Sequence, residues 1–134
     1  MKNYLLSLLC LLLFVNCSDD DDANKDTNLV GTWKITEAYV DPGDQSGKFQ
    51  PVDSDKEVTF HKNGTIQSNK SLCEVILLDQ NNLPTTGTYD LNSKTYTTIE
   101  CGSTEISYSF EIKENELIIH YNCIEGCSEK YIKK

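Results

Sequence analysis

The chain has 134 residues and a formal net charge of −9, and all 12 of its basic residues are lysines. An acidic chain without arginine is a poor nucleic-acid binder, because it cannot neutralise many phosphates or form a bidentate contact with guanine. Hydrophobic residues make up 38% of the chain, which favours one small folded domain over a disordered polypeptide.

The first 16 residues are typical of a secretory signal peptide. Lys2 provides a short positive region, and residues 4–15 form a leucine-rich apolar stretch. This stretch is too short for a membrane-spanning helix, which takes about 20 residues, and it suits the apolar region of a signal peptide. We therefore expect residues 1–16 to be absent from the mature protein.

Cys17 follows the apolar stretch and resembles the lipid-modified cysteine of bacterial lipoproteins. A serine and four aspartates come next, and residues 17–28 are predicted to be an acidic, solvated tether. A serine and acidic run in this position resembles the signal that sends lipoproteins of Bacteroidota to the outer face of the outer membrane. The resemblance implies a lipid anchor on Cys17. Ordinary cleavage or retention of the apolar segment is the alternative.

Residues 29–134 are predicted to form one all-β domain. Apolar, aromatic and β-branched residues occur in short runs separated by turn residues, and no stretch keeps a helical periodicity. Asn-Gly at residues 63–64 is a strong hairpin signal. Eight strands are predicted, at residues 31–40, 57–61, 65–72, 87–91, 94–101, 105–113, 117–123 and 128–133.

Most of the connections between these strands are short, so sequential strands should be antiparallel neighbours. Such strands close into a single up-and-down antiparallel β-barrel, which removes exposed sheet edges; an open sandwich is the alternative. Residues 41–56 and 73–86 form long connections, and residues 74–78 are assigned to a loop although they also suit a ninth strand. Because turns alternate between the two ends, both long connections and every cysteine of the domain are expected at one end.

The domain contains four cysteines, an even number that indicates two disulfides in an exported protein. Three pairings are possible. We expect Cys123 to bond Cys127 within a tight turn, which leaves Cys73 to bond Cys101 across the barrel mouth. A zinc site with four thiolate ligands is the alternative, although the Cys-x-x-Cys pairs that such sites usually contain are absent.

No arrangement of catalytic residues stands out, and we expect no enzymatic activity. The sequence has no nucleophile elbow, phosphate-binding loop or metalloprotease motif. The only histidines, His61 and His120, fall on separate strands and are interpreted as surface residues rather than metal ligands. Neither a metal nor a cofactor is predicted.

Gly31 and Trp33 form a Gly-X-Trp pattern at the head of the first predicted strand. This pattern resembles the signature of lipocalins and fatty-acid-binding proteins, and the whole mature chain resembles the lipocalin-like lipoproteins of Bacteroidota. The resemblance implies that Trp33 plugs a closed base of the barrel. Lipocalins usually stack an arginine on this tryptophan, so here Lys133 or Lys134 is expected to cover the ring by a cation–π contact.

Strict alternation along the first strand places Glu37 on the same face as Trp33, which predicts that Glu37 points into the barrel. A carboxylate there would be a polar anchor in an otherwise apolar pocket, the usual layout of a small-ligand site. A β-bulge that turns Glu37 outward is the alternative. Four aromatic residues are assigned to the wall of this pocket, or alternatively to the core: Tyr39, Tyr108, Phe110 and Tyr121.

We therefore expect a monomeric, surface-exposed lipoprotein of the outer membrane, whose barrel binds a small, partly apolar ligand at its loop-rich mouth. The alternative is a filled barrel whose long connections, residues 41–56 and 73–86, bind a protein or a glycan, as an inhibitor would. The two functions differ in whether side chains fill the interior of the barrel. A domain this short, with eight short strands, favours a filled barrel.

Overall fold

The structure is a computed structural model that describes residues 28–79, 83–102 and 105–134. The predicted signal peptide, Cys17 and all but the last residue of the predicted tether lie outside these ranges. Among the residues that are described, none belongs to a helix long and apolar enough to cross a membrane.

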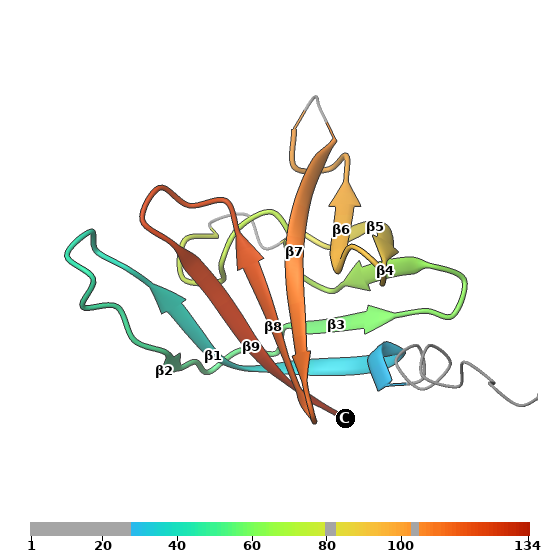
Figure 1. The fold of residues 1–134 in the computed structure, drawn as a ribbon, viewed down its shortest axis with the longest axis horizontal. Helices are drawn as coiled ribbons and strands as arrows, with labels where there is room; N and C mark the ends of the chain where they lie inside the picture. Colours follow the sequence, from blue (N-terminus) through green and yellow to red (C-terminus); the bar gives the residue numbers. More distant parts are fainter. Residues whose placement is uncertain (1–27, 80–82, 103–104) are drawn as a thin grey trace, which may run out of the picture.

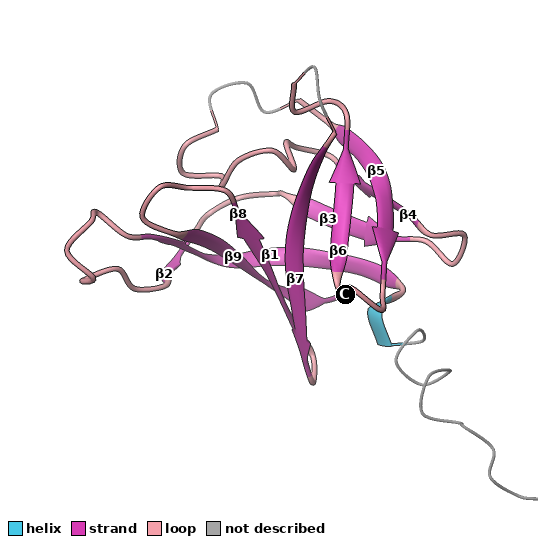
Figure 2. Ribbon diagram, turned by 45° about the horizontal axis from the view of Figure 1, so that its top comes forward, coloured by secondary structure: helices cyan, strands magenta, loops and turns pink. Residues whose placement is uncertain are grey.

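The described residues form one antiparallel sheet of nine strands in the order β2-β1-β3-β4-β5-β6-β7-β8-β9, and β1 also pairs with β9. That pairing closes β1 and β3 to β9 into the expected eight-strand up-and-down barrel (Figures 1 and 2). The strands are β1 (Gly31–Val40), β2 (Gln50–Pro51), β3 (Glu57–Phe60), β4 (Thr65–Ser68), β5 (Thr85–Asp90), β6 (Thr95–Thr98), β7 (Ile106–Lys113), β8 (Glu116–Tyr121) and β9 (Cys127–Lys133).

β2 is the strand that the sequence analysis did not predict. It lies within the long connection after β1 and pairs Pro51 with Glu37 and Gln50 with Ala38. β3 pairs with the first part of β1, so β2 and β3 lie along the same side of β1, one after the other. Residues 74–78 contain no strand, which agrees with their assignment to a loop.

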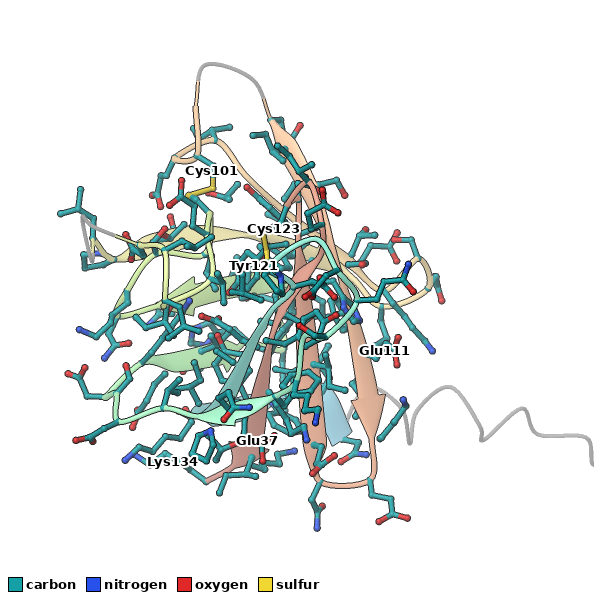
Figure 3. The ribbon with its side chains drawn as sticks, turned by 90° about the vertical axis from the view of Figure 1, so that its left-hand side faces the viewer. Glu37, Cys101, Glu111, Tyr121, Cys123 and Lys134 are labelled. Carbon is teal, nitrogen blue, oxygen red and sulfur yellow. A yellow bond between two sulfur atoms is a disulfide. The ribbon has the colours of Figure 1, made fainter. Side chains whose placement is uncertain are left out.

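Successive connections alternate between two ends of the barrel, which we call the base and the mouth. The mouth comprises the described residues of the connections 41–49, 69–84, 99–105 and 122–126, and the base comprises the turns at 61–64, 91–94 and 114–115. Figure 3 shows Cys101 and Cys123 toward the mouth and Lys134 toward the base.

Both disulfides lie at the mouth, and both join the pairs expected from the sequence. Cys73 is bonded to Cys101 with their Cα atoms 5.1 Å apart, and Cys123 is bonded to Cys127 with their Cα atoms 5.8 Å apart. The first bond connects the β4–β5 connection to the β6–β7 connection, and the second closes the β8–β9 turn. The thiols are therefore used in disulfides rather than in a zinc site.

Trp33 is fully buried in the base of the barrel. Its Nε1 donates a hydrogen bond to the carbonyl of Leu29 at 2.8 Å. The Nζ of Lys133 lies 5.3 Å from the centre of the Trp33 ring and donates to the carbonyl of Asn28 at 2.6 Å. Lys133 rather than Lys134 is therefore the lysine that covers the ring.

Gly31 makes this contact with Lys133 possible. Its φ of +134° lies in a region that favours glycine, and a Cβ at this position would lie 3.1 Å from the Lys133 Cε. The Gly-X-Trp pattern thus has a local reason, because the glycine leaves room for the lysine that covers the tryptophan.

Candidate functional site

The barrel interior is packed with aromatic side chains. Tyr108, Phe110 and Tyr121 point inward and are buried. The Phe110 ring centre lies 5.5 Å from that of Phe60, and the Tyr108 ring is stacked on Tyr96 at 5.1 Å and lies 5.9 Å from Tyr121. Ring pairs at these separations attract one another. These residues therefore form the core, which was the alternative to a pocket wall.

Glu37 and Tyr39 lie on the outer face of the barrel, so their predicted inward placement is wrong. The register between β1 and β9 shifts between Ile35 and Glu37, and this β-bulge reverses the faces of the residues that follow. The Glu37 carboxylate pairs with the Nζ of Lys130 at 2.9 Å. The Tyr39 hydroxyl donates to Asp41 at 3.0 Å. The bulge that was the alternative is the arrangement in the structure.

The connection after β1 is folded back onto this outer face. Asp41 accepts a hydrogen bond from the backbone N–H of Gly43 at 2.8 Å, and this bond contributes most to a lowered pKa of the Asp41 carboxyl. The Phe49 ring centre lies 5.6 Å from that of Tyr39 and 4.7 Å from the Nζ of Lys130. This side of the mouth is therefore held in place by specific contacts.

Part of the connection between β4 and β5 packs against the core at the mouth. We call residues 71–79 the plug segment; its Leu72 and Val75 are fully buried. The Tyr96 hydroxyl donates to the carbonyl of Leu72 at 2.8 Å, and the Tyr108 hydroxyl donates to the carbonyl of the next residue at 3.2 Å. Because tyrosines of the core bond its backbone, the plug segment closes the mouth over the aromatic core.

A buried ion pair that the sequence analysis missed lies next to the plug segment. The Lys56 Nζ is 2.8 and 3.0 Å from the two carboxylate oxygens of Glu129, and both side chains are fully buried. The same carboxylate accepts hydrogen bonds from the Tyr121 hydroxyl at 2.5 Å, from the Tyr131 hydroxyl, and from the backbone N–H of Ile76 at 2.5 Å. The network ties the plug segment to β8 and β9.

Burial sets the protonation of the groups around this carboxylate. Burial lowers the pKa of Lys56, and the charge of Glu129 opposes that shift. Burial is also the main cause of the raised pKa values of Tyr121 and Tyr131, which keep their hydroxyl protons and can donate them to Glu129. The network therefore surrounds the buried Glu129 carboxylate with donors, and neither this carboxylate nor the Lys56 ammonium is exposed to solvent.

Two alternation patterns point to this ion pair. Lys56 precedes the inward-facing Val58 and Phe60 with a period of two, and Glu129 shares a face of β9 with Tyr131. An unpaired charge is costly to bury, so opposite charges at inward positions of two strands predict a buried pair. Lys56 falls at the end of the predicted connection 41–56, so it was not assigned to the alternation of the strand that follows, and Glu129 was not predicted to point inward.

His120 lies on the outer face, as predicted, and links two neighbouring strands. Its Nδ1 is 2.8 Å from the Ser128 Oγ, and its Nε2 is 3.3 Å from a carboxylate oxygen of Glu111. Ser128 is buried within paired strands, whose backbone N–H groups donate to carbonyls of the neighbouring strands rather than to a developing oxyanion. This trio therefore serves as a hydrogen-bonded link. Over the described residues, no group of His, Cys, Asp and Glu is suited to hold a metal ion.

The family model of the lipocalin-like domain matches residues 29–131. The chain belongs to the lipocalin-like domain family. Its fold is similar to the crystal structure of a lipocalin-like protein from Bacteroides uniformis, with 17% sequence identity and a TM-score of 0.47 over 80% of this chain and 99% of that chain. No curated protein matches the sequence.

The candidate site of this lipocalin-like domain is the mouth. The interior polar groups bond one another and the plug segment, whereas the mouth exposes apolar side chains. Among the described residues, every exposed large apolar side chain except Ile132 of β9 belongs to a mouth connection. These mouth residues, which we call the mouth patch, are Leu77, Leu78, Leu83, Ile99 and Ile124.

Proposed function

We propose that this chain is a monomeric, non-catalytic binding protein, held at the outer face of the outer membrane by a lipid on Cys17, whose barrel is a filled scaffold for a binding mouth. The observation that carries this proposal is the closure of the mouth by the plug segment. Groups that would receive a ligand inside the barrel, Tyr96, Tyr108 and Glu129, already bond the backbone of that segment.

Binding of a small, partly apolar ligand inside the barrel is the second candidate function, and the lipocalin-like fold supports it. The polar anchor assigned to that ligand, Glu37, lies outside the barrel and pairs with Lys130. The carboxylate that does lie inside, Glu129, is neutralised by Lys56. These placements favour the mouth as the binding surface.

The two functions differ in their response to a fluorescent fatty acid such as cis-parinaric acid. We expect no saturable binding to the full chain in phosphatidylcholine nanodiscs after subtraction of binding to empty nanodiscs, because the aromatic core and the plug segment fill the barrel. The measurement is a fluorescence titration. Binding of one probe per chain, with displacement by unlabelled fatty acid, would instead support a ligand inside the barrel.

The lipid anchor is tested by Cys17→Ser. A single acyl chain binds membranes weakly and stable anchoring takes at least two membrane-binding signals, so we expect a multiply acylated Cys17 whose loss releases the protein. The measurement is the share of the protein in the membrane fraction. Cys10→Ser is the matched control and should stay in the membrane fraction, and protease added to intact cells should cut the parent protein. A Cys17→Ser protein that still sediments with membranes would contradict the anchor.

A further inference from the structure

The mouth patch is the feature of the surface that the fold itself does not explain. Its side chains come from several connections and are 49–99% exposed. The plug segment supplies Leu77 and Leu78, the β6–β7 connection supplies Ile99, and the β8–β9 turn supplies Ile124. Soluble proteins seldom gather large apolar side chains at one end unless that end contacts a partner.

The part of the patch on the plug segment is held rigidly. The carbonyl of Val75 accepts hydrogen bonds from the backbone N–H groups of Leu78 at 2.9 Å and Asp79 at 3.1 Å. The N–H of Ile76 donates to Glu129, and the disulfide of Cys73 fixes the start of the segment. A partner would therefore meet apolar side chains whose backbone is already ordered, which lowers the entropic cost of binding.

The described charged side chains of the mouth connections are mostly carboxylates. The described residues of the mouth contribute two lysines, Lys48 and Lys70, and Lys70 already pairs with Asp55 at 3.0 Å. Carboxylates that surround a binding surface attract cationic partners and repel anionic ones. The exposed carboxylates of the mouth are Asp44, Glu74, Glu100, Glu105 and Glu125.

Two other occupants fit this surface less well. A second copy of this acidic chain would bring two carboxylate-rich mouths together. A membrane surface suits the mouth less well, because the described chain joins the barrel at the base, where Asn28 contacts Lys133 and Glu114 (Figure 2). A tether from Cys17 would therefore attach at the end of the barrel opposite the mouth.

We infer that the mouth patch binds a cationic amphipathic polypeptide, in which lysine or arginine side chains flank apolar ones. The inference rests on the proposed function of the mouth as the binding surface. The apolar side chains of the partner would cover Leu77, Leu78 and their neighbours, and its cations would face the surrounding carboxylates. Opposite charges would speed the encounter, and apolar contact would hold the complex.

The test uses the full chain in phosphatidylcholine nanodiscs and three synthetic peptides of equal length, with binding to empty nanodiscs subtracted. One peptide contains lysine and leucine, one glutamate and leucine, and one lysine and serine. We expect the lysine–leucine peptide to bind most tightly, and to bind less tightly as salt rises from about 0.05 to 0.3 M, because salt screens exposed charges. The measurement is fluorescence anisotropy of the labelled peptides.

Substitutions in the patch identify where the peptide binds. Leu77→Ser with Leu78→Ser should weaken binding of the lysine–leucine peptide at least about tenfold, because two apolar contacts are lost. Ile132→Ser, at an exposed apolar residue outside the mouth, is the matched control and should change the affinity less than about twofold. Circular dichroism checks that each variant keeps the fold of the parent.

Each remaining outcome contradicts the inference in a different way. If the glutamate–leucine peptide binds as tightly and responds to the same leucine substitutions, the mouth binds apolar partners without regard to charge. The cationic partner is then wrong, while the proposed function of the mouth as a binding surface is kept. If the lysine–serine peptide binds equally, charge is sufficient and the mouth patch is not needed. If no peptide responds to the leucine substitutions, the cationic partner is wrong, while the fatty-acid titration and membrane fractionation still decide the proposed function.

Discussion

Trp33→Ala is expected to lower the free energy of unfolding by about 3–5 kcal/mol, the usual loss when a buried aromatic side chain is removed from a core. Trp33 is fully buried in the base, and its Nε1 bonds the carbonyl of Leu29. The substitution also removes the ring beneath the Lys133 ammonium. Because Trp33 is the only tryptophan of the chain, unfolding in urea should be followed by circular dichroism rather than by tryptophan fluorescence.

Ile132→Ala is the control for the effect of Trp33. Ile132 is an apolar residue of β9 that is 48% exposed, so its removal should change stability by less than about 1 kcal/mol. Equal urea midpoints for Trp33→Ala and the parent would show that Trp33 does not close the base, and the Gly-X-Trp pattern would then have no structural role here.

Lys56→Met is expected to lower the free energy of unfolding by about 3–5 kcal/mol relative to the parent, because it leaves the Glu129 carboxylate buried without its cation. Lys130→Met is the matched control, since Lys130 pairs with Glu37 on the outer face, where an ion pair contributes less than about 1 kcal/mol. Urea unfolding followed by Trp33 fluorescence measures both. A Lys56→Met protein as stable as the parent would show that the ion pair does not hold the mouth together.

A double variant separates the charge of Glu129 from its hydrogen bonds. Glu129 also accepts bonds from Tyr121, Tyr131 and the backbone of Ile76, so an apolar replacement would leave several buried donors without an acceptor. Glu129→Gln removes the charge and keeps one acceptor oxygen. We therefore expect Lys56→Met with Glu129→Gln to regain more than half of the stability lost in Lys56→Met alone. No regain would mean that the lysine acts through packing rather than charge.

The barrel could be predicted from the sequence because its signals are local. The Asn-Gly turn at 63–64 and the alternation through Tyr108 and Phe110 each depend on neighbouring residues. Turn parity, which needs only the number of strands, placed the four cysteines of the domain at one end, and the tight turn between Cys123 and Cys127 favoured the pairing that the structure has. The position of Trp33 at the base was expected from the resemblance at Gly31 and Trp33. The contact of Lys133 with both residues gives a physical reason for that pattern.

The candidate site could not be predicted in the same way, because its geometry depends on partners far along the chain. Strict alternation places Glu37 inside, but the bulge that turns it outward is a property of the pairing between β1 and β9. Residues 74–78 of the plug segment were assigned to a loop although they also suit a strand, and the sequence did not indicate the contacts of that loop. Its loop conformation depends on bonds from Tyr96, Tyr108 and Glu129, which lie elsewhere in the barrel. Such long-range contacts leave no short pattern in the sequence.

The pairing of β1 with β9 also sets the order in which the molecule can assemble. β1 is the first barrel strand in the chain and β9 the last. A chain synthesised from its N-terminus therefore contains Trp33 and Lys56 before it contains Lys133 and Glu129. Contacts between distant parts of a chain form slowly. During that delay the sheet has two open edges that can pair with other chains. A chain cut before Glu129 would therefore not give a smaller barrel; it would stay an open, aggregation-prone sheet.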